Sequence, residues 1–84
     1  MSFRAEVKVT LKPGIADPQG QTIERALPAL GYDVARDVRV GKLIELTVEA
    51  SSAEEARERV EEMCERLLAN PVIESYDVVV RDGA

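Results

Sequence analysis

The start of the chain alternates strictly between apolar and polar side chains, and no other feature of the sequence restricts the fold so much. Apolar residues occupy every second position from Phe3 to Leu11, and charged residues or threonine fill the gaps. A period of two places the apolar side chains on one face of a β-strand, because successive side chains point to opposite faces. The chain is therefore expected to build a sheet with one buried face.

A helix is expected after this strand and a short loop. Asp17 can cap its first turn, and Pro18 can occupy the first helical position, where a missing N–H costs nothing. Apolar residues recur at helical spacing up to Leu30, and Gly31 suits the left-handed conformation that ends many helices. Pro28 cannot donate to the preceding turn, so we expect a kink or a final turn of different character there.

The middle of the chain contains two β-rich runs, residues 34–40 and 43–50, separated by Gly41-Lys42. Glycine followed by another residue between two such runs fits a two-residue hairpin. One long strand bent at the glycine is the alternative, and both interpretations remain open at this point.

A second helix is expected to begin at Ser52, which forms a capping box with Glu55. Asn70-Pro71 ends this helix, and residues 72–81 are expected to form the last strand. The inner face of the helix is expected to carry its apolar residues, Ala53, Ala56, Val60, Met63, Cys64 and Leu67.

The expected order is strand, helix, strand, strand, helix, strand, which is the split βαβ or ferredoxin-like arrangement. This α+β fold has a four-stranded antiparallel sheet with both helices on one face. Residues 1–84 are expected to form a single domain, since no linker interrupts them. The first and third strands would be central neighbours, and pairing Lys8 with Glu45 and Arg4 with Glu49 would set opposite charges side by side.

The composition excludes most catalytic chemistry. The chain has no histidine, so catalytic triads, most zinc sites and most general-base schemes are not expected. Its single cysteine, Cys64, lies on the apolar stripe of the second helix and is expected to be a buried structural thiol. The alternating Glu and Arg residues of that helix are expected to form a solvated face and not a cation site.

Charge and hydropathy argue against nucleic acid and membrane partners. The chain has 11 basic and 16 acidic residues, a net charge of −5 that repels phosphate backbones. No apolar run approaches the roughly 18 residues that cross a bilayer, and no secretory signal precedes the first strand, so a cytoplasmic location is expected. A chain of 84 residues buries too little surface to be very stable alone, which favours a homodimer or higher homo-oligomer.

Two segments are not explained by packing alone. The loop from Lys12 to Gly20 places two prolines and two glycines around a helix start, and we favour a rigid loop that docks on a partner over a nucleotide site. The segment from Arg39 to Lys42 places two cations around a turn. These cations are either solubilising charge or a contact for a carboxylate or phosphate on another protein.

The same segments resemble a known family. The runs K-P-G-I-A-D-P-Q-G at residues 12–20, V-R-V-G-K at 38–42 and L-L-A-N-P-V-I-E at 67–74 are similar, in order, to those of the PurS family. That family is the small subunit of phosphoribosylformylglycinamidine synthase, the amidotransferase of purine biosynthesis. The resemblance extends from Val7 to about Val80, and Pro28 departs from the family pattern.

The resemblance implies a subunit with no catalytic residues of its own. In such systems a synthetase subunit uses ATP and magnesium to activate formylglycinamide ribonucleotide, and a glutaminase subunit releases ammonia from glutamine. The small subunit would bind no cofactor or metal, form a homodimer or higher homo-oligomer, and bridge the two larger subunits so that formylglycinamidine ribonucleotide is made. The residues expected to contact these partners are Lys12, Asp17, Pro18, Gln19, Gly20, Arg39, Gly41, Lys42, Leu68, Asn70, Pro71 and Glu74.

The main alternative is a small-molecule-binding regulatory module that acts as a dimer, because split βαβ folds often bind metabolites between paired copies. A pocket between subunits, lined by the turn from Asp17 to Gly20, would favour it. RNA recognition on the open sheet face is disfavoured, since that face is expected to carry charged residues without an aromatic platform.

Overall fold

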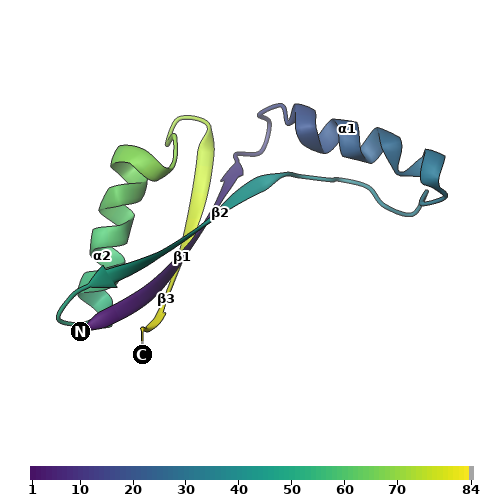
Figure 1. The fold of residues 1–84 in the computed structure, drawn as a ribbon. Coiled ribbons are helices and arrows are strands. Elements are labelled where there is room, and N and C mark those ends of the chain that lie inside the picture. Colours follow the sequence, from purple (N-terminus) through teal and green to yellow (C-terminus); the bar gives the residue numbers. More distant parts are fainter. Residues whose placement is uncertain (84) are drawn as a thin grey trace.

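The computed structural model describes residues 1–83, and its sheet has three strands. β1 (Ser2–Leu11) lies in the centre and pairs antiparallel with β2 (Gly41–Glu49) on one side and β3 (Glu74–Asp82) on the other. α2 (Ala53–Met63) packs along this sheet, whereas α1 (Pro18–Ala26) lies beyond one end of it (Figure 1). The molecule is therefore elongated, with extents of 51 × 29 × 14 Å.

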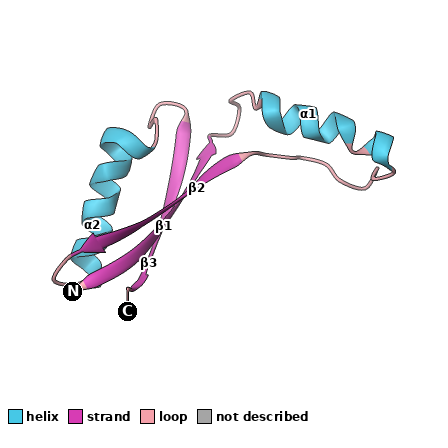
Figure 2. Cartoon of the chain, in the orientation of Figure 1, coloured by secondary structure: helices cyan, strands magenta, loops and turns pink. Residues whose placement is uncertain are grey.

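The expected four-stranded sheet with two helices on one face is wrong. Residues 34–40 form no strand; they run extended beside α1 and return the chain to the sheet (Figure 2). We call residues 17–40 the arm, because they project from the sheet as one unit. Neither the hairpin nor the long bent strand describes this part of the chain, since β2 begins at Gly41.

Side-chain acceptors explain why the return half of the arm is not a strand. The backbone N–H of Val38 donates to the carboxylate of Glu24 at 2.9 Å, and that of Val40 donates to the carboxylate of Asp17 at 2.8 Å. Asp37 between them has a φ of +59°, which is incompatible with a regular strand. Two of the donors that a fourth strand would offer to a neighbour are thus used inside the arm.

β1 and β2 pair two residues away from the expected register. Lys8 lies opposite Leu43, and Glu45 lies opposite Glu6. A shift of two residues keeps every side chain on its own face, so the apolar pattern fits both registers equally well. The close approach of the strands at Gly41 favours the observed register, because a Cβ there would lie 2.6 Å from the carbonyl oxygen of Val9.

On the open face of the sheet, charged residues of β1 pair with both neighbouring strands. The predicted charge pairs considered β1 and β2 alone. Glu6 forms an ion pair with Arg81 of β3, at 3.2 Å. Arg4 reaches Glu45 diagonally, at 3.8 Å. Because β1 has a neighbour on both sides, its charges do not need directly opposite partners on β2.

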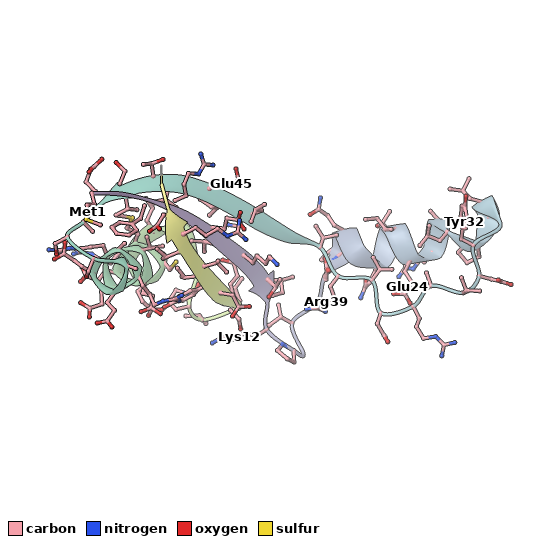
Figure 3. The ribbon with its side chains drawn as sticks, turned by 90° about the horizontal axis from the view of Figure 1, so that it is seen from below. Met1, Lys12, Glu24, Tyr32, Arg39 and Glu45 are labelled. Atoms are coloured by element: carbon pink, nitrogen blue, oxygen red, sulfur yellow. The ribbon has the colours of Figure 1, made fainter. Side chains whose placement is uncertain are left out.

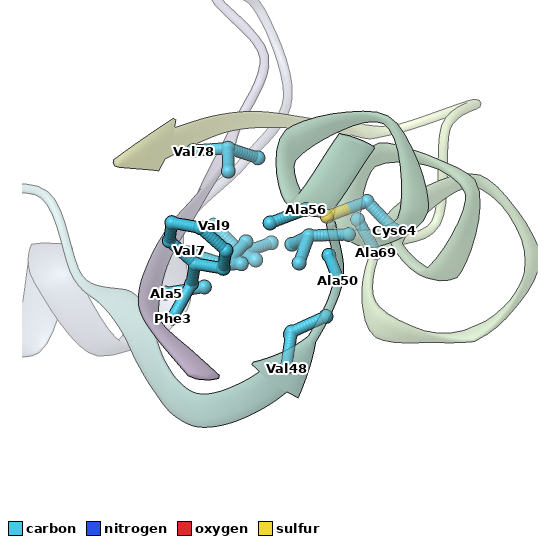
Figure 4. Close-up of a cluster of buried hydrophobic side chains, with 11 residues drawn as sticks. Phe3, Ala5, Val7, Val9, Val48, Ala50, Ala56, Cys64, Ala69 and Val78 are labelled. Carbon is cyan, nitrogen blue, oxygen red and sulfur yellow. The ribbon is translucent and has the colours of Figure 1, made fainter. Parts of the chain in front are cut away.

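The core lies between the sheet and α2. The alternating apolar residues of β1 from Phe3 to Val9 are buried, with Val7 fully so, and they share one core with Ala56 and Cys64 (Figure 4). Cys64 has no exposed surface, and burial raises the pKa of its thiol. The predicted structural thiol is therefore confirmed.

Both predicted helix starts are confirmed. The Asp17 carboxylate accepts the N–H of Gly20 at 3.0 Å, with Pro18 in the first turn. The Ser52 hydroxyl accepts the N–H of Glu55 at 3.1 Å. The Glu55 carboxylate reaches back one residue further than expected, to the N–H of Ser51, and this bond lowers its pKa.

The ends of the two helices depart from a regular α-helix. α1 stops at Ala26, and a 3-10 turn follows over Pro28–Leu30, as the proline predicted. α2 continues as a wide π turn over Cys64–Leu68. This turn moves the apolar stripe by one residue, so Leu68 packs against the core while Leu67 is 82% exposed. The prediction that Ala53, Met63 and Leu67 face inward is thus wrong, since all three are exposed.

Shortening the central valine of the sheet should destabilise the chain. Val7→Ala removes two methyl groups from a fully buried position and leaves a cavity, so we expect a loss of about 2 kcal/mol in the free energy of unfolding. Denaturant unfolding of the isolated chain measures it. The matched control is Val72→Ala, at a residue that is 77% exposed, and an equal loss in both variants would contradict the core assignment.

Candidate functional site

Most of the expected contact residues gather where the arm joins the sheet, a region that we call the arm base. Lys12 directly follows β1, and its ammonium group donates a hydrogen bond to the carbonyl oxygen of Pro71, at 2.6 Å. Leu68 lies apart from this region and packs against the core. A cleft of about 360 Å³ at the arm base is lined by Val9, Leu11, Asp17, Pro18, Gln19, Val40, Gly41, Lys42 and Glu74.

The carboxylate of Asp17 organises the arm base. The residue is only 5% exposed, and its two oxygens accept backbone N–H groups from both halves of the arm. One oxygen binds Gly20 in α1 at 3.0 Å, and the other binds Val40 in the returning segment at 2.8 Å. These two hydrogen bonds, together with the nearby Arg39 guanidinium, hold the pKa of Asp17 below its ordinary value. A carboxylate stabilised in this way stays ionised and keeps the two segments together.

Arg39 adds a second connection at the same place. Its Nε lies 4.0 Å from the Asp17 carboxylate. Its guanidinium also donates to the carbonyl oxygen of Leu11 at 3.3 Å and to those of Lys12 and Ile15 at 3.5 Å. Figure 3 places Arg39 at the junction, with Glu24 and Tyr32 further out along the arm. The side chain thus joins the chain that leaves the sheet to the chain that returns to it.

Gly20 is required by the crowding around this carboxylate. A Cβ on Gly20 would collide with Oδ2 of Asp17 and would lie 2.5 Å from the carbonyl oxygen of Val38. Gly14 meets a different need, since its φ of +86° lies in the left-handed region. Several residues between Lys12 and Gly20 are therefore explained by the structure, and most of them help to attach the arm to the sheet.

A second set of contacts fixes the loop before β3. The carboxylate of Glu74 accepts the backbone N–H of Asn70 at 2.6 Å and lies 3.9 Å from the ammonium group of Lys42. The side chain of Asn70 accepts the N–H of Val72 at 3.1 Å. Lys42 keeps more than half of its side chain exposed, so its charge is available at the surface of the arm base.

The contacts of the arm base hold distant segments of the chain together. Among residues 1–83, no group of three or more His, Cys, Asp and Glu side chains could hold a metal ion. In the same part of the chain, no helix has the length and apolar character needed to span a bilayer.

Sequence reasoning missed a set of large apolar side chains that face solvent. Three lie toward the tip of the arm: Leu30, Tyr32 and Val34, with exposures of 70%, 58% and 84%. Leu67 and Val72, which follow α2 in the chain, are also exposed. Periodicity assigned Leu30 and Leu67 to helix stripes, and Val34 and Val72 to strands. The available signal was that residues 32–40 carry apolar side chains without a clear alternation.

The sequence matches the PurS family, described as phosphoribosylformylglycinamidine (FGAM) synthase, over residues 4–82. The chain belongs to the PurS family. The PurS subunit of Methanocaldococcus jannaschii is 44% identical over 78 residues, which cover 93% of this chain and 94% of that protein. The Bacillus subtilis subunit is 44% identical over 80 residues, with 95% and 94% covered.

Solved PurS structures have the same fold. The crystal structure of M. jannaschii PurS gives a TM-score of 0.88 at 40% identity and covers 98% of this chain and 99% of that one. A chain in the structure of PurLQS from Thermotoga maritima gives the same TM-score and identity, with 95% and 98% covered. PurS is a non-catalytic subunit of phosphoribosylformylglycinamidine synthase, a glutamine-dependent ligase that uses ATP. The sequence-based interpretation of the chain as the small subunit of this enzyme is therefore confirmed.

The arm base is expected to loosen in acid. The folded-state pKa of Asp17 lies below its ordinary value, so its contribution to stability is complete above about pH 4 and is lost as the pH falls through the folded-state pKa. The difference in the free energy of unfolding between the native chain and Asp17→Asn should therefore be constant from about pH 7 to about pH 5 and should shrink as the pH falls below about pH 4. Denaturant unfolding across this range measures it, and a difference independent of pH would contradict this role.

Proposed function

We propose that this chain bridges the glutaminase and synthetase subunits of the synthase, so that ammonia released from glutamine reaches activated formylglycinamide ribonucleotide. ATP and magnesium would act on the synthetase subunit, and this chain would bind neither. The assembly would work in the cytoplasm. The residues named as partner contacts remain part of this proposal, with the exposed Lys42 and Gln19 as candidates at the surface of the arm base.

The residue inventory supports a bridging role. The chain has no histidine to move protons near neutral pH. Its one cysteine is buried with a raised pKa, which is the opposite of an activated nucleophile. The chain would instead contribute protein–protein contact surface. Transfer of ammonia between two active sites requires such surfaces, because they exclude water.

The shape of the chain is the observation that carries the proposal. Its radius of gyration is 16.3 Å, whereas a compact domain of this length has about 12 Å. It exposes 6116 Å², against about 4,900 Å² for a compact monomer of 9.2 kDa. The excess of about 1,200 Å² exceeds the roughly 800 Å² that one partner contributes to a standard interface. A chain of this shape is suited to being covered by other proteins.

A second copy of the chain is the first partner in this proposal. The tip of the arm exposes Leu30, Tyr32 and Val34. On the sheet, α2 packs mainly over β3 and leaves β2 less covered. Apolar surface at both places would be buried if the arms of two copies packed against each other or across the neighbouring sheet. A homodimer would then present its two sheets to the larger subunits.

Omitting the chain tests the bridge directly. In an assay of amidine product with both larger subunits and glutamine, we expect turnover to fall at least about tenfold without this chain, because ammonia then escapes to solvent. With added ammonia in place of glutamine, turnover by the synthetase subunit should change little. Equal glutamine-dependent turnover with and without the chain, at normal ammonia-dependent turnover, would contradict the bridging role.

A charge at the tip of the arm should disrupt the homodimer. Val34→Asp places a carboxylate at a residue that is 84% exposed in the single chain, and its burial between copies would cost desolvation free energy. Sedimentation equilibrium should show twice the chain mass of 9.2 kDa for the native protein and a dissociation constant raised at least about tenfold for the variant. Leu67→Asp, at a residue that is 82% exposed and outside the arm, is the matched control. An unchanged mass for Val34→Asp, or equal effects of the two changes, would count against the arm as the interface.

A further inference from the structure

We infer that Asp17 is a positioning residue for the assembled synthase: its carboxylate locks the arm at one angle to the sheet, and that angle is required for glutamine-dependent turnover. This inference rests on the proposed bridging function and names the residue on which the geometry of the bridge depends. Asp17 touches no reacting group, and it acts through the segments that it joins.

The hydrogen bonds of Asp17 join the two halves of the arm, and its ion pair with Arg39 connects them to the end of the sheet. Its Oδ1 accepts the N–H of Gly20 at the start of α1, and its Oδ2 accepts the N–H of Val40 just before β2. Arg39 extends the connection to the carbonyl oxygens of Leu11 and Lys12 at the end of β1. A single buried carboxylate therefore ties the helix of the arm, the return of the arm and the sheet to one another.

The rest of the arm base offers little to replace this carboxylate. The arm is joined to β1 by residues 12–16 and continues directly into β2 at Gly41. Glu24 binds the N–H of Val38 further along the arm, whereas Asp17 also forms an ion pair with Arg39, whose guanidinium reaches the end of β1. The carboxylate lies so close to Gly20 that a Cβ on that residue would collide with it. The orientation of the arm thus depends mainly on Asp17 and its partner Arg39.

The arm converts a small rotation at its base into a large displacement at its tip. From Pro18 to Leu30 the helical part is about 20 Å long, so a rotation of about 10° moves the tip by roughly 3.5 Å. A displacement of that size separates packed surfaces, since a gap of only about 1 Å already loses up to about half of the dispersion attraction between two atoms. Subunits that must enclose ammonia between them would then no longer meet tightly.

Two substitutions at Asp17 separate this role from helix capping. Asp17→Asn and Asp17→Ser both keep a side-chain oxygen that can cap the helix at Gly20. Neither supplies a second anionic oxygen for the N–H of Val40 and the guanidinium of Arg39. Circular dichroism should therefore show an intact helix content in both variants, with the arm free to rotate at its base.

The test uses the complete synthase with the chain added at increasing concentration. We expect both Asp17 variants to lower glutamine-dependent turnover at least about tenfold, with ammonia-dependent turnover within about twofold of the native assembly. The loss should persist when the variant chain is saturating. A residue that only stabilised the fold would lower the amount of folded chain, and added chain would restore the rate.

Two further variants complete the experiment. Gly20→Ala drives a methyl group into the Asp17 carboxylate and the carbonyl oxygen of Val38 without removing a charge, and it should reproduce the loss. It also keeps the inference testable if the Asp17 variants do not fold. The control is Glu58→Gln, the same carboxylate-to-amide change at an exposed residue of α2, and it should leave both rates unchanged.

Recovery of glutamine-dependent turnover at saturating variant chain would overturn the inference, as would native rates in the Asp17 and Gly20 variants. If the native chain itself does not affect glutamine-dependent turnover, the proposed bridging function fails, and the inference fails with it. The native chain is therefore measured first, so that the two failures are distinguished.

Discussion

Two backbone N–H groups, one from each half of the arm, meet on the carboxylate of Asp17, and the shape of the molecule depends on this arrangement. The carboxylate uses the donor of Val40 that would otherwise pair with a neighbouring strand. It also starts α1 at a point beyond the end of β1, away from the sheet. An elongated chain with a projecting arm is the result, where a compact ferredoxin-like domain was expected.

The elements of the chain were largely predictable from sequence, because each depends on local chemistry. The alternation in β1, the proline that ends α1 and the capping residue Ser52 all act within a few residues of their own position. The buried state of Cys64 also followed from helical spacing. Such features are independent of where the element lies in the fold.

The arrangement of the elements was less predictable, for physical reasons. A register shift of two residues leaves the apolar pattern unchanged, and the close contact at Gly41 that favours the real register depends on the approach of another strand. Residues 34–40 have the composition of a strand, yet their donors bind Glu24 and Asp17. At the arm base, the motif residues were recognised, but their role in attaching the arm depends on contacts between distant segments.

Hydrogen exchange at the amide of Val40, followed by NMR in the isolated chain, tests this account most directly. If the Asp17 carboxylate holds the arm, this amide should exchange at least about 100-fold more slowly than in an unstructured peptide. The protection should disappear in Asp17→Asn, while the amide of Val7 in the centre of the sheet stays protected. Free exchange of the Val40 amide in the native chain would show that the arm is not held there and would contradict the account.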